Sequence, residues 1–508
     1  MDTTFSASAS ASASASASAS DSASSESPRT ERLLVWGPLV ATLASTLLLA
    51  LGGCASSAGI APHANLLSPA VLGLQVPVPP VAVSTEPDVS AAWWNGFGDT
   101  ALSGLIEQAL SGNPNLRVAS ARLARAQAAV SGTEAGSGLQ VNGSLELMRQ
   151  RYTANGLVPP PIAGSIRENG TLQVAASWEF DFFGRHRSAL DAALGSERAA
   201  QADVQAARVL LAANVARSYV QLARLVEQRD VAERALAQRD DMTRLVRQRV
   251  DAGLDTTVEL RQSEGALPES RQQVEALSEQ IALARHALAV LTGQSPEALD
   301  ALTPRLQALS PVTVPPVLPA DLIGRRADLA AARARVEAAT SDMASAKAQF
   351  YPNVNLTAFV GLSSLGFDRL LKSGSEQYGA GPAIRLPIFD AGRLRANLRG
   401  KTAELDAAVE TYNATLFDAV RDVCDQISST QSLVRQQQQQ ALAQASAESA
   451  YDLATQRYKA GLGTYLVVLN AESGLLNQRR LATDLKARAI DTQVSLVRAL
   501  GGGYAAAQ

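Results

Sequence analysis

The feature that most constrains the fold of this chain is an internal duplication. Residues 249–265 read RVDAGLDTTVELRQSEG and residues 457–473 read RYKAGLGTYLVVLNAES, so a shift of 208 residues superimposes their AGL tripeptides. The same shift places Gly184-Arg185 on Gly392-Arg393, and each pair follows an aromatic-rich segment. The chain is therefore a tandem duplication with a unit of about 200 residues, and both halves are expected to contain the same elements.

Each half contains one exceptionally long helical stretch. From about Arg185 to Ala252 the sequence has no proline and only one glycine, Gly195, and the second half repeats this pattern from about Arg393 to Ala460. About 65 residues that each rise 1.5 Å predict a rod about 100 Å long. We therefore expect two such rods, one from each repeat.

Each rod ends at an AGL tripeptide, and a shorter return helix is expected after it. The return helices are predicted over 256–291 and 464–499. Glycine is favoured just after a helix C-terminus because it adopts the left-handed conformation without strain. Gly253 and Gly461 are therefore the predicted corners of two helical hairpins.

Four segments change from the helical period to alternation of apolar and polar residues. The expected strands cover about 139–150 and 170–183 in the first half and about 352–362 and 376–389 in the second. Alternation over about ten residues is typical of membrane-barrel strands; an ordinary half-buried sheet is the alternative. Four strands cannot close a barrel, and lipid does not tolerate an open strand edge. The chain is therefore expected to oligomerise, with two, three or more copies completing one barrel.

The N-terminal region has the pattern of an export signal. Residues 1–53 combine a Ser/Ala-rich extension, expected to be disordered, with arginines and an apolar run of about 18 residues. The run ends in LLLALGGCASS, which resembles a lipoprotein signal with Cys54 as the lipidated residue. An ordinary transmembrane anchor is the alternative. Residues 54–90 are rich in proline, alanine and valine and are expected to form a lipidated, extended tether.

Composition argues against several other classes of protein. A net charge of -3 gives no basic surface for nucleic acid. Two cysteines, three histidines and no CxxC motif leave little material for a disulfide framework or a metal site. Glu179 and Asp181 could suggest a glycosidase pair, but no second catalytic element accompanies them. We therefore expect no enzyme, no catalytic residue, no metal, and no cofactor besides a covalent lipid on Cys54.

Several motifs, taken in order, resemble one family. Between residues 91 and 502 the chain contains WWNGFGDTALSGLI, NPNLRVASARL, SWEFDFFGRHR, PADLIGRRADLAAARARVEAA, AQFYPNVNLTAFVG, GPAIRLPIFDAGR and QRYKAGLGTYLVVLNAESGLL. This series resembles the TolC-type outer-membrane efflux factors in their lipoprotein branch, which is OprM- and NodT-like. The resemblance implies an α+β membrane protein that forms a homotrimer. Four strands from each chain contribute to a 12-stranded β-barrel, which a long α-helical periplasmic tunnel continues.

The resemblance also implies the organisation and function of the chain. The first repeat covers 91–300 with its tip near 253, the second covers 301–502 with its tip near 461, and 503–508 form a C-terminal tail. Such a protein is the exit duct of a tripartite efflux system in the outer membrane of a Gram-negative bacterium, and it extends into the periplasm. It passively exports small molecules from an inner-membrane pump of the RND type through a periplasmic adaptor. Two alternatives stay open: the duct of a type I protein-secretion system, and a lipid-anchored coiled-coil scaffold without a channel.

Functional residues follow from the resemblance at two places. The residues expected to contact the adaptor are those at the two tips: Gly253, Leu254, Gly461 and Leu462. The periplasmic gate is expected at Leu466 and Asn470, where OprM-like proteins have a leucine and an aspartate. The usual carboxylate ring is therefore replaced by an uncharged amide ring, and the closed state is expected to depend little on acid or magnesium.

Replacement of Cys54 tests the expected lipid anchor. Cys54→Ser removes the thiol that would carry the lipid, so metabolic labelling with radioactive palmitate should be lost. Cys424→Ser removes the other cysteine and should leave labelling intact. Normal labelling of Cys54→Ser would refute the assignment of a lipoprotein signal.

Overall fold

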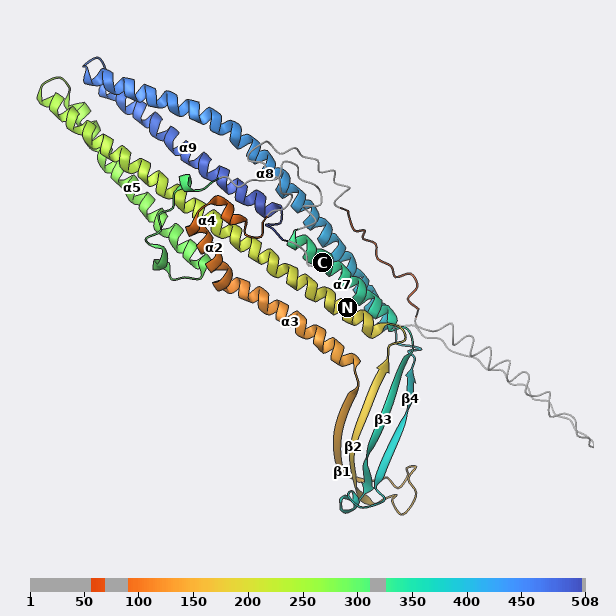
Figure 1. Cartoon of the computed structure of the whole chain (residues 1–508). Helices are drawn as coiled ribbons and strands as arrows, with labels where there is room; N and C mark the ends of the chain where they lie inside the picture. The colour runs from red at the N-terminus through yellow and green to blue at the C-terminus, as the bar shows by residue number, and fades with distance from the viewer. Residues whose placement is uncertain (1–55, 69–89, 311–325, 505–508) are drawn as a thin grey trace, which may run out of the picture. The chain divides into compact units, whose positions relative to one another are not determined.

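The computed structural model describes residues 56–68, 90–310 and 326–504. The predicted signal and its Cys54, residues 69–89 of the predicted tether, and the last residues of the tail lie outside the described residues. The described residues all belong to one compact unit, Ala55–Gln508. Figure 1 shows its helices and, at one end of them, its strands.

Two helices of equal length dominate this unit. Helices α4 (Arg185–Asp251) and α8 (Arg393–Lys459) each contain 67 residues, and their first residues are 208 positions apart (393 minus 185). Each begins directly after a glycine with positive φ, Gly184 at 75° and Gly392 at 87°. The predicted duplication is therefore confirmed in the elements that form most of the chain.

The remaining helices flank these two. The return helices α5 (Thr257–Thr292) and α9 (Tyr465–Ala499) run back along α4 and α8. Because α9 packs on both α4 and α8, the four long helices form one layer in the order α5, α4, α9, α8 (Figure 1). The shorter helices are α2 (Thr100–Gly112), α3 (Pro114–Ser137), α7 (Ala327–Ala348) and the 3-10 helices η2 (Trp93–Phe97), η3 (Pro296–Leu299), η4 (Leu306–Ala308) and η5 (Phe367–Arg369). Within the described residues, no helix combines the length and apolar character needed to cross a membrane.

The four strands form one antiparallel sheet in chain order. They are β1 (Gln140–Arg151), β2 (Ile166–Phe180), β3 (Asn353–Leu365) and β4 (Glu376–Arg385). The strand expected over 170–183 begins and ends earlier, at Ile166 and Phe180. The strand expected over 376–389 ends at Arg385, and Pro387 explains this because proline has no N–H to continue a ladder.

Strand register gathers most of the large apolar residues of the four strands on one face of the sheet. Leu172 of β2 lies opposite both Leu145 and Leu362, and Val360 of β3 lies opposite both Val174 and Tyr378. The other face is mostly polar, although it carries Met148 and Phe359, and there Gln377 donates a hydrogen bond of 3.3 Å to Gln173. The outer edges of β1 and β4 pair with no described strand of the same chain. The sheet therefore has one apolar face, one polar face and two open edges.

A belt of short elements packs against one side of the helical layer. Trp93, Phe97 and Ile106, from η2 and α2, share a buried cluster with Tyr219 of α4. Asp99 caps the first turn of α2 and also accepts a hydrogen bond of 2.7 Å from the Tyr219 hydroxyl. We call η2, α2, η3 and η4 the belt.

The two repeats also pack closely where α4 crosses α7. A Cβ atom added to Gly195 would lie 2.9 Å from the Cβ of Ala338 and 3.0 Å from its backbone nitrogen, so only glycine fits there. The N-terminus of α7 is held by Arg326, whose guanidinium makes a two-pronged ion pair with Asp328 and lies 3.5 Å from Asp422 of α8. The Gly195–Ala338 contact therefore joins the two repeats, and the contacts of Arg326 fix α7 to α8 within the second repeat.

The described part of the predicted tether, residues 56–68, is fixed along α8. Asp406 accepts hydrogen bonds of 2.8 and 3.0 Å from the backbone N–H groups of His63 and Ala64. Asn413 accepts one of 3.0 Å from Leu67, and Arg395 donates to the carbonyl of Ser56. Side chains of α8 therefore satisfy the extended backbone of this segment.

Candidate functional site

The two hairpin corners have the same local geometry. Gly253 and Gly461 have φ of 70° and 74°. In the first corner the N–H of Leu254 donates to Arg249 O at 2.8 Å, and in the second the N–H of Leu462 donates to Arg457 O at the same distance. These bonds to a carbonyl five residues back cap the last turn of each long helix in a Schellman motif. The sequence therefore placed both corners at the right residue.

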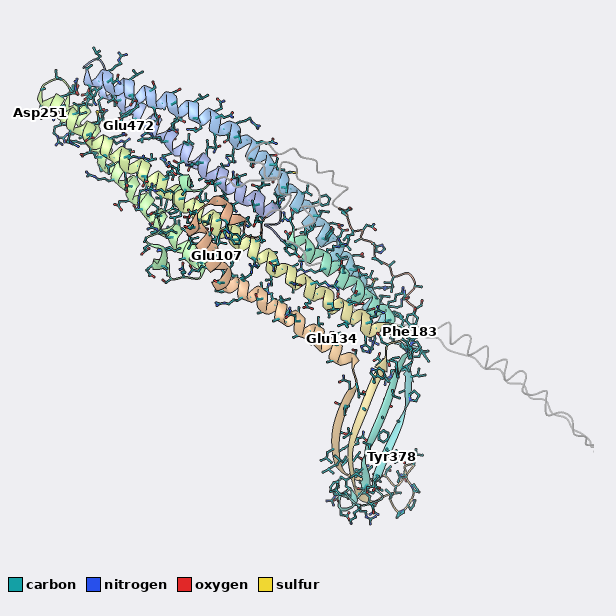
Figure 2. The ribbon with its side chains drawn as sticks, in the orientation of Figure 1. Glu107, Glu134, Phe183, Asp251, Tyr378 and Glu472 are labelled. Atoms are coloured by element: carbon teal, nitrogen blue, oxygen red, sulfur yellow. The ribbon has the colours of Figure 1, made fainter. Side chains whose placement is uncertain are left out.

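Each corner presents a leucine to solvent. Leu254 is 65% exposed and Leu462 is 69% exposed. Neither corner glycine has an atom within 4 Å of the position that a Cβ would take. The ends of both hairpins are therefore open apolar surfaces (the end of α4 is marked by Asp251 in Figure 2).

A charged network joins the two hairpins just behind their corners. Arg249 and Asp255, from the first hairpin, form a two-pronged ion pair with distances of 2.9 and 3.2 Å. Tyr458, from the second hairpin, donates a hydrogen bond of 2.5 Å to Asp255, and the Arg249 guanidinium lies 4.8 Å from its ring centre. Tyr458 is fully buried. The network therefore holds the last turn of α4 against the last turn of α8.

The electrostatics of this network favour the charged pair. The hydrogen bond from Arg249 lowers the pKa of Asp255, burial opposes this, and the bond from Tyr458 lowers it further. Burial and the neighbouring Asp255 carboxylate raise the pKa of Tyr458, which stays a neutral donor. Because the folded pKa of Asp255 lies below its unfolded value, the pair stabilises the tips fully above about pH 4, and this stabilisation is lost as the pH falls through the folded pKa.

The two predicted gate residues lie on one exposed side of α9. Leu466 is 52% exposed, and Asn470, one turn further from the tip, is also exposed. Their neighbours Tyr465 and Val468 point the other way, into a buried cluster with Tyr458. Within this single chain, neither gate residue is thus part of the packing that holds the tips together.

A second polar contact links the repeats further from the tip. Arg239 of α4 lies 3.2 Å from both carboxylate oxygens of Glu472 on α9 and donates to Ser270 of α5 at 2.8 Å. Glu472 is marked in Figure 2. Burial raises the pKa of Glu472, and Arg239 opposes this rise. One guanidinium therefore ties three of the four long helices together.

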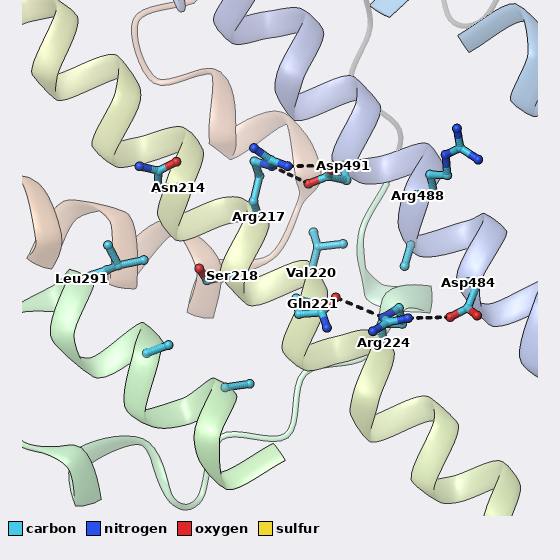
Figure 3. A pocket seen from close by; sticks show the side chains of 13 residues that line it. Asn214, Arg217, Ser218, Val220, Gln221, Arg224, Leu291, Asp484, Arg488 and Asp491 are labelled. Atoms are coloured by element: carbon cyan, nitrogen blue, oxygen red, sulfur yellow. Dashed lines mark hydrogen bonds and ion pairs between the residues drawn. The ribbon is translucent and has the colours of Figure 1, made fainter. Parts of the chain in front are cut away.

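A polar groove of about 830 Å³ runs along the same layer, between α5 and α9 and over α4. Two ion pairs cross it (Figure 3). Arg217 lies 2.7 Å from Asp491, and Arg224 lies 2.8 Å from Asp484. Asp484 also accepts a hydrogen bond of 2.6 Å from Gln228. The groove is therefore lined by charged groups from both repeats.

The carboxylates that sequence reasoning weighed for catalysis have structural roles. Glu179 lies 2.5 Å from Arg185 and 3.1 Å from His186, and Asp181 accepts from the backbone of Arg187 in the first turn of α4. His186 lies in the first turn of α4, and its side chain is 20% exposed. Glu179 therefore covers the junction between β2 and α4.

Sequence reasoning missed Asp255 and Tyr458. Both stand where the repeats differ, since the 208-residue shift places Asp255 on Gly463 and Tyr458 on Val250. The sequence did carry a signal for them: both are polar residues that lie close to an AGL corner, at positions where the two repeats differ. That the two meet each other is visible only in the packed hairpins.

Comparisons with known proteins agree on one family. The family described as outer membrane efflux protein is matched over residues 105–294 and 318–502. Fusaric acid resistance protein FusA of Burkholderia cepacia is 36% identical over 383 residues, which is 74% of this chain and 71% of that protein. Multidrug resistance outer membrane protein MdtQ of Escherichia coli O6:H1 is 31% identical over 466 residues, with 90% and 97% covered.

Solved structures share the fold. The outer membrane protein VceC of Vibrio cholerae has 34% sequence identity and a TM-score of 0.76, with 82% of this chain and 100% of that chain covered. The outer-membrane channel OprN has 28% identity and a TM-score of 0.77, with 84% and 98% covered. The predicted fold class is therefore confirmed.

Removal of the Tyr458 hydroxyl tests the network behind the tips. Tyr458→Phe leaves the ring but deletes a hydrogen bond to a charged group, which is worth about 1.5–3 kcal/mol, so amides at the two corners should exchange at least about tenfold faster. Hydrogen–deuterium exchange with mass spectrometry measures this. Tyr465→Phe is the matched control, because the structure gives this buried hydroxyl no hydrogen bond among the described residues. Equal exchange in the two variants would contradict a fastening role for Tyr458.

Proposed function

Because this chain belongs to the outer membrane efflux protein family, we propose that it is the exit duct of a tripartite efflux system. One observation supports this most directly: a sheet with an apolar face and two open edges continues into the paired 67-residue helices. Copies of the chain that join β4 of one to β1 of the next close a barrel, and their helices close a tunnel below it. Three copies of four strands give the 12 strands that the family resemblance implies.

The duct receives small molecules from an inner-membrane pump of the RND type through a periplasmic adaptor. Leu254 and Leu462 are the adaptor contacts, because they are exposed apolar groups at the far end of the helices from the sheet. The chain acts as a passive conduit and not as an enzyme. A duct for type I protein secretion uses the same surfaces, and the identity of the co-purified pump distinguishes the two.

Lipid on Cys54 anchors the chain to the outer membrane. The contacts of Ser56, His63 and Ala64 with α8 support this, because they hold the segment after Cys54 beside the first turns of α8, where that helix leaves the sheet. The anchor adds to the apolar face of the sheet and does not replace it.

Charged tips test the adaptor contact. Leu254→Asp together with Leu462→Asp keeps both corner glycines and changes only exposed surface. Drug efflux from cells should fall to the level of a strain that lacks the duct, while trimer yield stays unchanged on native mass spectrometry. Leu157→Asp is the control, since Leu157 is fully exposed in the loop between β1 and β2, away from the helices. Full efflux in the double variant would rule out docking at the tips.

The gate is tested by single-channel current in planar bilayers. Leu466 forms an apolar ring and Asn470 an amide ring in the trimer, so Leu466→Ser should raise the resting conductance several-fold. Asn470→Asp should introduce block by micromolar divalent ions from the periplasmic side, because carboxylate oxygens bind such ions and amides carry no charge.

The adjacent exposed residue provides the control for the gate. Val467 is 55% exposed but lies about 100° around α9 from Leu466, so Val467→Ser should leave the resting conductance unchanged. If the natural protein is already blocked by micromolar divalent ions, or if Leu466→Ser conducts like Val467→Ser, the gate is elsewhere.

A further inference from the structure

The helical layer has two different sides, and only one of them is covered by the belt. On α4, Tyr219 and Val226 pack under the belt. Arg217, Gln221 and Arg224 line the polar groove instead. Five residues separate Tyr219 from Arg224, which is about 140° around a helix. The groove side and the belt side are therefore opposite sides of one layer.

The groove side is continuous with the side of α9 that carries the gate residues. From Leu466 and Asn470 the same stripe passes Ser473, Asn477 and Arg480 in steps of three and four residues, which keeps it on one helical face. It then reaches Asp484, Arg488 and Asp491 in the groove. A second groove, between α8 and α9, shares Asp484 and Arg488 with the first. These residues form a single surface, which we call the inner face.

This surface faces the lumen of the proposed duct. The belt lies on the other side of the layer, where Tyr219 holds Asp99. If the layer were turned the other way, the belt would fill the tunnel. The inner face is therefore the one that a transported molecule meets.

The charges on the inner face do not cancel. Arg217, Arg224 and Arg239 are each paired with a carboxylate of α9. Three further arginines line the inner face, are exposed, and have no acidic partner within ion-pair distance among the described residues: Arg435 of α8 and Arg480 and Arg488 of α9. In Figure 3, Arg488 lies apart from both dashed ion pairs.

Two acidic groups reduce this excess without abolishing it. Asp425 is exposed and lies seven residues before Ser432, so it shares the inner face of α8, and Glu269 is exposed one turn before Gln273 on α5. Each chain therefore contributes three unpaired guanidinium groups against these two unpaired carboxylates. The excess is repeated in every copy of a trimer.

We propose that this ring of arginines makes the duct selective for anions and that its transported molecules are small amphipathic organic anions. The proposal rests on the proposed function, because it requires the layer to enclose a lumen. Clefts lined by one sign of charge between low-dielectric walls concentrate ions of the opposite sign. Guanidinium groups match carboxylates in geometry as well as charge.

The apolar residues between the arginines indicate the chemistry of the uncharged part of the transported molecule. Val220, Ala284 and Leu291 line the first groove beside Arg217 and Arg224, and Leu481 and Leu485 line the second beside Arg435 and Arg488. A carboxylate with one aromatic ring or a short alkyl chain uses both kinds of surface. A cation of the same size meets the same apolar groups but an unfavourable potential.

Reversal potentials across planar bilayers test the selectivity. Purified trimer is placed between unequal concentrations of potassium chloride, and then of potassium benzoate. The natural protein should pass the anion in preference to potassium in both salts. The triple variant Arg435→Glu, Arg480→Glu, Arg488→Glu should lower the ratio of anion to potassium permeability by about tenfold or more, since charge of one sign in a cleft changes local ion concentration by about that factor.

Two further variants keep the outcome interpretable. Arg271→Glu is the matched control, because Arg271 is exposed on α5 and lies 14 residues, about four turns, from Arg285, which binds the Leu302 carbonyl next to the belt. It should leave the permeability ratio unchanged. The triple glutamine variant should give an intermediate ratio, and it replaces the glutamate variant if that one fails to form trimers.

The possible results distinguish failure of the arginine ring from failure of the proposed duct. A trimer that conducts but prefers potassium, or whose permeability ratio is the same in the triple variant and in Arg271→Glu, overturns the arginine ring and leaves the duct intact. The arginine ring is also overturned if the triple variant loses adaptor binding but keeps its permeability ratio. In that case the arginines lie on the outer surface of the duct. A trimer with no conductance overturns the duct, and the proposal falls with it.

Discussion

A β-strand in lipid cannot leave its backbone hydrogen-bonding groups unpaired, and the rest of this structure depends on that constraint. The described residues form four strands with an apolar face across them and two open edges. Only additional copies of the same chain can satisfy both edges by one repeated contact, β4 to β1. Since β2 and β4 lead into α4 and α8, closing the sheet also arranges the helices in a ring.

The duplication supplies the scaffold, whereas departures from it supply the functional groups. The long helices, their glycine starts and their AGL corners are shared by both repeats. The charged stripe of α9 is not: the 208-residue shift places Arg480, Asp484 and Arg488 on Gln272, Ala276 and Gln280 of α5. A tunnel lined alternately by the two repeats is therefore charged mainly on one of them.

Ion pairs between the repeats have a further consequence for motion. Near the tip, polar contacts through Asp255, Tyr458 and Glu472 accompany a small apolar cluster of α4, α8 and α9, whereas near the belt a larger apolar cluster holds the layer. Segments with fewer buried apolar contacts open at lower free energy. The tip end of the layer is thus the end expected to separate without unfolding the rest.

Local signals in the sequence determined the elements of this protein. Absence of proline, glycine at the corners and alternation in the strands each act within a few residues, so Gly253, Gly461 and the four strands could be found without a structure. Tertiary structure alone decided the strand register, the meeting of Asp255 with Tyr458, and which side of α9 the belt leaves open. These depend on contacts between residues about 200 positions apart, whose partners no local pattern specifies. For the same reason, the role proposed for Arg435, Arg480 and Arg488 follows only from the packed structure, which shows which charged groups have ion-pair partners.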